Sequence, residues 1–190
     1  MSTTKKPFPV RRLVLNAMLV AIYVVLGYLR IPIGNTFRIS VAPFAVIFCA
    51  LLYGPVDGLL VGFLGEFLTQ VLGPYGLTQT TLLWCVGETV RGFTLGLCAM
   101  LILKKLILTA SRPAGRHIAL ILVCCALTGV LAALGQTLAL YVDSKMLGYY
   151  SYAMVFGALV ARMGIYIAVS GLLGYLCLPI ITALRKAKLV

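Results

Sequence analysis

Long runs of apolar residues, interrupted by Pro, Gly and charged positions, divide the chain into six segments. The longest runs, Ile118 to Leu140 and Met154 to Ile181, contain only a few polar residues. A helix needs roughly 20 apolar residues to cross a bilayer, whereas a membrane β-strand alternates apolar and polar residues. The pattern therefore predicts an all-α membrane protein with six transmembrane helices. We expect these helices at about 12–30, 41–54, 57–73, 80–106, 116–141 and 152–183.

The connections between these segments leave no room for a soluble domain, so residues 1–190 are expected to form a single transmembrane domain. The second and third segments are joined only by Gly54-Pro55-Val56-Asp57, which predicts a tight helical hairpin. The first segment follows a basic stretch, as a signal peptide would, but no small-residue cleavage site follows it. We therefore interpret it as a retained helix.

Composition supports the membrane assignment, because 62% of the residues are hydrophobic, 11% are charged and the mean hydropathy is +1.09. A soluble fold of this composition would expose large apolar patches. The net charge of +12 would suggest nucleic acid in a soluble protein. Eleven of the 16 basic residues lie instead in three clusters that flank apolar runs. They are Lys5, Lys6, Arg11 and Arg12; Lys104, Lys105, Arg112 and Arg116; and Arg185, Lys186 and Lys188.

The distribution of these cations predicts the orientation of the chain. With six crossings, all three clusters lie on one face together with both termini, and the other face carries Arg30, Arg38 and Lys145. The positive-inside rule then places both termini in the cytoplasm of a bacterial cell membrane. The six cysteines lie inside apolar runs without CxxC spacing, so we interpret them as small, reduced, buried hydrophobes.

Four ionisable residues fall at membrane depth: Glu66, Glu88, Arg91 and Arg162. Such residues are costly and usually form pairs or serve function. Glu88 and Arg91 are three positions apart and share one helix face. They either form an ion pair that locks helices together or line a polar cavity for a ligand, and Glu66 with Arg162 is a possible second pair across helices.

The outer loops combine aromatic rings with hydrogen-bonding groups, in residues 31–38, 73–80 and 146–152. An interfacial aromatic belt is one interpretation, and a lid over an externally accessible pocket is the other. The candidate substrate-binding residues come from these loops and from the helix that follows the second loop. They are Arg38, Tyr75, Gln79, Trp84, Glu88, Arg91, Tyr149 and Tyr152.

Sequence signatures of enzymes are missing, since the chain has no HExxH, Walker A or GxSxG sequence, and its single histidine, His117, has no partners for a zinc site. We expect no catalytic residue, metal site or cofactor in this chain. Any uphill transport would take its energy from an ion gradient or from another subunit. A self-sufficient secondary transporter or channel, with Glu66 or Glu88 as proton carrier, is the main alternative, and a membrane-embedded enzyme is a third.

Three stretches together resemble one known family. They are Ala17-x-x-x-Ala21 in the first helix, residues 37–44 (FRISVAPF), and residues 51–66 (LLYGPVDGLLVGFLGE), where a Gly-Pro turn leads into a Gly-rich helix that ends in an acidic residue. With its size and six spans, the chain resembles the substrate-binding S components of energy-coupling factor (ECF) transporters, which import vitamins into bacteria.

The resemblance implies a mechanism and partners. A vitamin would bind in an outward pocket formed by the later helices, and the loaded subunit would dock on a membrane T subunit with two cytoplasmic ATPases, which hydrolyse the ATP. The small-residue face of Ala17 and Ala21 would be the docking surface. The pairs Gly58/Gly62 and Gly92/Gly96 repeat this spacing, which lets helices approach closely.

The resemblance narrows the identity of the ligand only to a class of compounds. Residues 73–76 (GPYG) are similar to folate-type members, but residues 77–84 depart from the Pro-Gly-Phe-Thr segment of those proteins. Folate or another aromatic heterocycle, such as a pterin, a flavin or a deazaguanine, would fit. Glu88 would accept hydrogen bonds from ring amino groups, and Arg91 or Arg38 would bind a carboxylate or phosphate.

Overall fold

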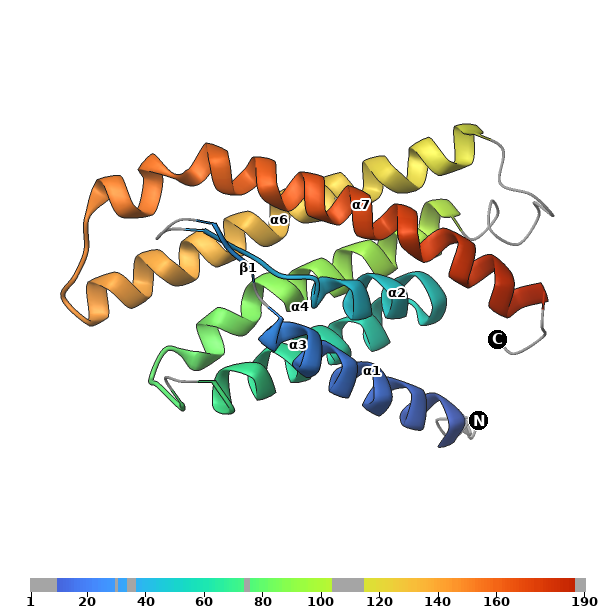
Figure 1. The fold of residues 1–190 in the computed structure, drawn as a ribbon, viewed down its shortest axis with the longest axis horizontal. Helices are drawn as coiled ribbons and strands as arrows, with labels where there is room; N and C mark the ends of the chain where they lie inside the picture. The colour runs from blue at the N-terminus through green and yellow to red at the C-terminus, as the bar shows by residue number, and fades with distance from the viewer. Residues whose placement is uncertain (1–9, 30, 34–36, 74–75, 104–114, 187–190) are drawn as a thin grey trace, which may run out of the picture.

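The computed structural model describes residues 10–29, 31–33, 37–73, 76–103 and 115–186. Across these residues the protein is a helical bundle with one short β-hairpin (Figure 1). The helices are α1 (Val10–Tyr28), α2 (Pro43–Tyr53), α3 (Pro55–Val71), α4 (Thr81–Cys98), α6 (Gly115–Met146) and α7 (Leu159–Lys186). The π-helical segment η1 (Ala99–Leu103) extends α4, and η2 (Ala153–Gly157) precedes α7.

The predicted all-α membrane fold is confirmed, and each of the six expected segments contains a helix. Among the described residues, four helical stretches are long and apolar enough to cross a membrane: Val10–Tyr28, Thr81–Leu101, Ile118–Met146 and Ala153–Leu184. Helix α2 has only 11 residues. At about 1.5 Å per residue it is too short to cross a hydrocarbon core of about 30 Å by itself.

Helices α6 and α7 lie side by side, and α1 and α3 lie on the other side of α4 (Figure 1). Helix α2 packs on α1, α3 and α7. Helix α4 packs on α2, α3 and α6. The start of α1, the α2–α3 turn and the end of α7 lie at one end of the bundle, whereas the α6–α7 connection lies at the other (Figure 1). This arrangement agrees with an even number of crossings.

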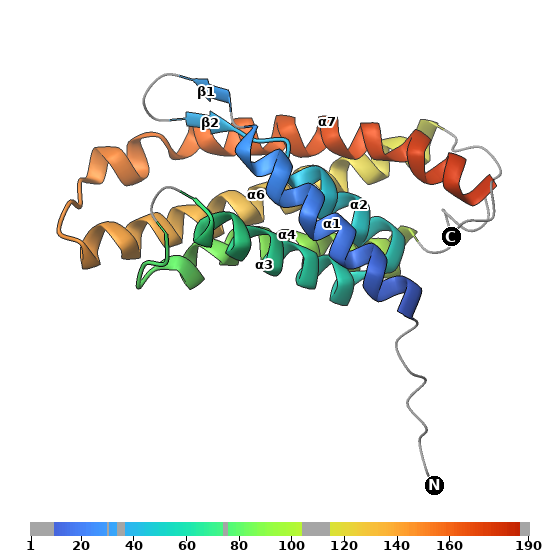
Figure 2. The same ribbon diagram turned by 60° about the horizontal axis from the view of Figure 1, so that its bottom comes forward.

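The first outer loop contains structure that the sequence did not predict. Strands β1 (Ile31–Ile33) and β2 (Phe37–Ile39) pair in antiparallel fashion, with Pro32 opposite Arg38. The hairpin lies beside α7, and β2 packs against that helix (Figure 2). Residues 31–33 and 37–39 of the expected outer loop therefore form a short sheet on one side of the bundle.

The tight hairpin predicted between the second and third segments is present. Helix α2 ends at Tyr53 and α3 begins at Pro55, so Gly54 alone separates them. Gly54 has φ of 98°, a conformation that glycine adopts without steric cost. Pro55 occupies the first turn of α3, where the missing N–H of proline is not needed.

Helices α3 and α4 meet along a glycine seam formed by Gly58, Gly62, Gly92 and Gly96. A Cβ atom at Gly92 would lie 2.1 Å from the carbonyl oxygen of Gly58, and one at Gly62 would lie 2.6 Å from that of Glu88. The two backbones therefore touch with no side chain between them. The close helix approach expected from the Gly-x-x-x-Gly spacing is confirmed as internal packing.

Candidate functional site

Two deeply buried charged groups lie in the middle of α4. Glu88 is 4% exposed and Arg91 is 1% exposed. Their side chains form an ion pair, with 3.2 Å between Arg91 Nη1 and Glu88 Oε1. One turn of helix separates them, so the helix itself places both groups on the face that points into the bundle.

This ion pair leaves hydrogen-bonding capacity unused. Glu88 Oε2, Arg91 Nε and Arg91 Nη1 are buried without a hydrogen-bond partner in the described part of the chain. The 3.2 Å contact is thus electrostatic and does not meet hydrogen-bond geometry. Burying polar atoms of charged groups without hydrogen bonds is costly, so the pair is poorly suited to a purely structural role.

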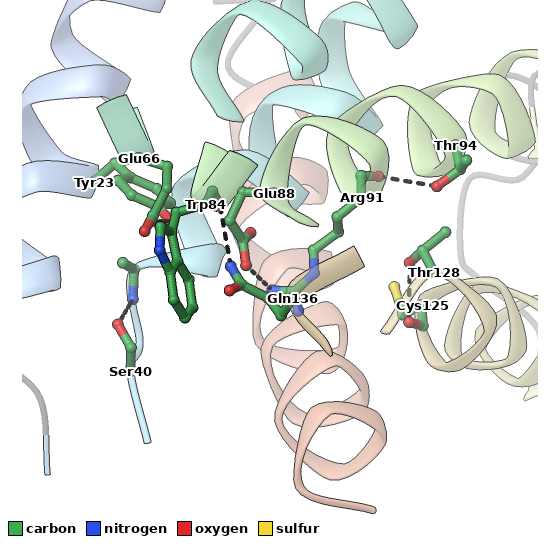
Figure 3. A network of polar contacts seen from close by, with 11 residues as sticks. Tyr23, Ser40, Glu66, Trp84, Glu88, Arg91, Thr94, Cys125, Thr128 and Gln136 are labelled. Carbon is green, nitrogen blue, oxygen red and sulfur yellow. Dashed lines mark hydrogen bonds and ion pairs between the residues drawn. The ribbon is translucent and has the colours of Figure 1, made fainter. Parts of the chain in front are cut away.

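Aromatic and amide groups from three helices surround the pair. The guanidinium carbon of Arg91 lies 5.1 Å from the centre of the Tyr166 ring on α7, which is a cation–π contact. Gln136 of α6 donates a hydrogen bond of 3.3 Å to the carbonyl oxygen of Trp84. Figure 3 shows that Trp84, Glu88 and Arg91 of α4 and Gln136 of α6 lie close together. We call these four residues and Tyr166 the α4 polar cluster.

Glu66, on α3, is fully hydrogen-bonded. Its Oε2 accepts a bond of 2.6 Å from the Tyr23 hydroxyl, and its Oε1 accepts one of 2.7 Å from Gln70 Nε2. Arg162 instead donates to Thr137 Oγ1, at 3.0 Å. The pairing of Glu66 with Arg162 considered from the sequence is therefore not formed, because Glu66 bonds to Tyr23 and Gln70 and Arg162 bonds to Thr137.

A second polar centre lies at the end of the bundle opposite the termini. Asp143, near the end of α6, is buried and accepts hydrogen bonds from the hydroxyls of Thr80 and Tyr149. Burial, together with the hydrogen bond and the negative charge of Asp143, raises the pKa of Tyr149 to about 12. Asp143 thereby ties the turn before α4 to the connection that follows α6.

The remaining predicted site residues are dispersed. Gln79 is exposed in the turn before α4. Tyr152 is 71% exposed, with its ring centre 5.2 Å from that of Phe156. Arg38 lies in β2, and Tyr75 lies outside the described residues. The structure therefore brings together Trp84, Glu88 and Arg91, and no recorded hydrogen bond or ion pair among the described residues links the other candidates to them.

Sequence reasoning missed several members of these networks. Tyr166 lies one turn after Arg162, and that spacing was a usable signal, since residues four apart share a helix face. Asp143 was also detectable, because the chain has only four acidic residues. Tyr23 and Gln136 gave no signal, because their partners lie on distant segments of the chain.

The predicted docking residues lie on the outer surface of the bundle. Ala17 and Ala21 are exposed on α1, next to the exposed Met18. The opposite face of the same helix is buried and includes Val20 and Tyr23. The two alanines therefore form a small-residue surface that is available to another membrane helix.

Comparison with known proteins gives one family match. The model of the family described as "ECF-type riboflavin transporter, S component" matches residues 8–111 of the chain. Those residues include α1, the β-hairpin, α2, α3 and α4, and thus both members of the buried ion pair.

Related sequences include proteins named UPF0397. One from Streptococcus pneumoniae is 31% identical over 93 residues, which is 47% of this chain and 48% of the relative. One from Vibrio atlanticus is 27% identical over 101 residues, covering 52% and 54%. The chain spans about half the length of the curated relatives it matches.

Two solved structures share the fold. An S-component for biotin from an ECF-type ABC transporter superposes with a TM-score of 0.63 at 20% identity, over 98% of this chain and 95% of the other. The S component of a bacterial ECF transporter gives a TM-score of 0.56 at 19% identity, over 94% and 95%. At these identities the likeness concerns the fold alone.

Proposed function

The chain belongs to the family of ECF-type riboflavin transporter S components, and from this premise we propose that it binds a vitamin with a planar aromatic heterocycle at the α4 polar cluster. As a member of this family it is a membrane-embedded substrate-binding subunit of a transporter and not an enzyme. The proposal concerns the chemical class of the substrate, the residues that bind it and the partners that complete the transporter.

The observation that carries the proposal is the incompletely bonded pair of Glu88 and Arg91. The edge of a nitrogen heterocycle presents N–H donors beside carbonyl acceptors, which complement a carboxylate oxygen and a guanidinium. Ligand sites are mostly apolar, with a few polar groups that fix orientation. The rings of Trp84 and Tyr166 would supply the aromatic faces on which such a heterocycle stacks.

We place a flavin first among the candidates, since the family description names riboflavin. The flavin ring carries one N–H between two carbonyl groups, so Glu88 would accept a hydrogen bond from that N–H while Arg91 would donate one to a carbonyl oxygen. A folate-type ligand is second, because its amino group and ring N–H would face the carboxylate of Glu88 as a pair of donors. Charge-assisted hydrogen bonds of this kind are the strong ones in ligand sites.

The chain offers a direct readout for this proposal, because Trp84 is its single tryptophan. Titration of the purified protein with riboflavin should quench the fluorescence of Trp84, and folate is the comparison ligand. The variant Trp84→Phe has no tryptophan fluorescence, so its ligand binding is measured by calorimetry. The heat of binding then shows whether the variant still binds the ligand. Mass spectrometry of what co-purifies in mild detergent should recover the same ligand. Absence of both quenching and heat with either vitamin contradicts the proposed substrate class.

We propose that the partners are a membrane T subunit and two ATPases, that ATP is hydrolysed by those ATPases, and that this chain carries no cofactor. The exposed alanines of α1 support a docking role for that helix. Ala17→Trp should abolish ATP-dependent uptake and leave ligand affinity unchanged. Leu138→Trp, at an exposed position of α6, is the matched control. Proton-driven uptake by this chain alone in liposomes would instead establish a self-sufficient transporter.

A further inference from the structure

The acidic residues of this chain can be accounted for completely. There are four of them, Asp57, Glu66, Glu88 and Asp143, and all four lie in the described part of the structure. Two form ion pairs, Asp57 with Arg12 and Glu88 with Arg91. The other two are bonded to neutral groups, Glu66 to Tyr23 and Gln70, and Asp143 to Thr80 and Tyr149. No acidic side chain is left to neutralise Arg162.

Arg162 lies within the apolar stretch Ala153–Leu184, where an unpaired charge is expensive. It is half-buried, and its one hydrogen bond among the described residues goes to Thr137 Oγ1. The Thr137 hydroxyl donates its own proton to the carbonyl oxygen of Ala133, at 2.7 Å, so its oxygen acts as the acceptor for Arg162. A guanidinium has five N–H groups and stays charged, which leaves most of its donors for another acceptor.

The surroundings of Arg162 place it beside the α4 polar cluster. Arg162, Tyr166 and Ser170 are spaced four residues apart on α7 and therefore share one face. Arg91 lies over the Tyr166 ring, and Ser170 Oγ is buried without a hydrogen-bond partner among the described residues. A Cβ atom at Gly129 of α6 would come within 2.8 Å of both Ser170 Oγ and the Tyr166 carbonyl oxygen. This face of α7 is thus turned toward α4 and α6.

We infer that Arg162 binds an anionic group, a carboxylate or phosphate, carried by the same ligand whose ring occupies the α4 polar cluster. Glu88 and Arg91 offset each other, so Arg162 leaves the site with one uncompensated positive charge. The planar guanidinium suits bidentate binding of either anion. The inference rests on the proposed function and adds that the preferred substrate is acidic. The phosphate of an anionic lipid has the same chemistry, so the experiment must separate the two sources.

The test compares riboflavin with riboflavin 5′-phosphate, which share a ring and differ in one anionic group. The protein is placed in phosphatidylcholine nanodiscs, and binding is followed by Trp84 fluorescence. The phosphate ester should bind at least about tenfold more tightly, since hydrogen bonds between two charged groups are among the strongest in ligand sites. Arg162→Gln should reduce this ratio to about one and leave riboflavin affinity nearly unchanged, whereas Arg162→Lys should retain part of it. Lys145→Gln removes a positive charge elsewhere and should change nothing.

Equal affinity for the two flavins, or a ratio that survives in Arg162→Gln, overturns the inference and leaves the proposed function intact. Failure of both flavins to bind overturns the proposed substrate class, and the inference with it. Nanodiscs that also contain phosphatidylglycerol provide the second arm. If that lipid abolishes the preference for the phosphate ester in the wild-type protein, Arg162 is occupied by a lipid phosphate and the assignment to the vitamin is wrong.

Discussion

The ion pair at the start of α1 and the ion pair in the middle of α4 each join a carboxylate to an arginine, yet their surroundings differ. Both oxygens of Asp57 accept hydrogen bonds, Oδ2 from Arg12 and Oδ1 from Asn16 at 2.6 Å. Arg12 also donates to the carbonyl oxygen of Tyr53, at 2.6 Å. Glu88, by contrast, has one oxygen with no partner among the described residues.

This difference separates a structural pair from a binding pair. The bonds around Asp57 and Arg12 connect α1 to both helices of the α2–α3 hairpin, so this pair holds three elements together. The pair in α4 joins two residues of a single helix, so it holds no two elements together. The Glu88 carboxylate has one oxygen left to accept a hydrogen bond from a ligand, whereas both oxygens of the Asp57 carboxylate are already bonded within the protein.

The largest effect is expected from Asp57→Ala. Removing one member of a buried ion pair leaves the other charge unmatched, and such losses reach about 3–5 kcal/mol. Because Arg12 is a third exposed, we expect about 3 kcal/mol of lost stability, at the low end of that range. Ligand affinity should be unchanged. Thermal unfolding in detergent measures the loss, with Val56→Ala as the control, and a fall in affinity without a fall in stability would reverse the two roles.

A smaller effect of the opposite kind is expected from Glu88→Gln. The amide keeps the shape of the side chain but lacks the charged acceptor, so ligand affinity should fall by about 1.5–3 kcal/mol, or roughly ten- to hundredfold. Stability should also fall, because Arg91 stays buried without its carboxylate, and removing the unpaired oxygen Oε2 offsets only part of that loss. The fall in ligand affinity, measured by calorimetry on the folded variant, is therefore the deciding result. Glu66→Gln is the matched control: it breaks a fully bonded carboxylate and should lower stability while sparing the affinity measured by calorimetry.

The smallest effect concerns Asp143, a carboxylate that accepts hydrogen bonds from the hydroxyls of Thr80 and Tyr149. Tyr149→Phe removes one of these bonds and should cost about 1 kcal/mol at neutral pH. The pKa of Tyr149 is raised from 10.0 to about 12 in the folded protein, so the stabilisation is complete below pH 10 and is lost as the pH rises through 12. The stability difference between wild type and variant should therefore shrink above pH 10. A difference that stays constant through pH 12 would show that the bond to Asp143 does not raise the pKa of Tyr149, and no difference at neutral pH would show that the bond contributes nothing.

Much of the fold could be predicted because it depends on local patterns. Apolar runs identified the helices. Gly54 and Pro55 identified the turn between α2 and α3, which consists of Gly54 alone. The length of α2 was overestimated, because residues 41 and 42 continue the apolar run without joining the helix. The β-hairpin at residues 31–39 was not predicted, since each strand has only three residues, too few for an alternating pattern to be recognised.

The candidate site was predictable only where its members lie on one helix. Trp84, Glu88 and Arg91 were identified together because helical spacing brings them to a common region of α4. Tyr166 and Gln136 reach the same place from α7 and α6, and their positions depend on how those helices pack. Helix packing is set by the shapes of many side chains at once, so no short stretch of sequence encodes it.

The glycine seam has a mechanical consequence. At Gly62 the backbone of α3 rests directly on the carbonyl of Glu88, and one turn later, at Gly65, a Cβ atom would lie 2.7 Å from the ring of Tyr23 in α1. With no flexible side chain to absorb motion, displacing α1 would push α3 and carry the acidic residue of α4 with it. A partner protein bound to the outer face of α1 would thereby change the affinity of the site at Glu88 without contacting the solute bound there.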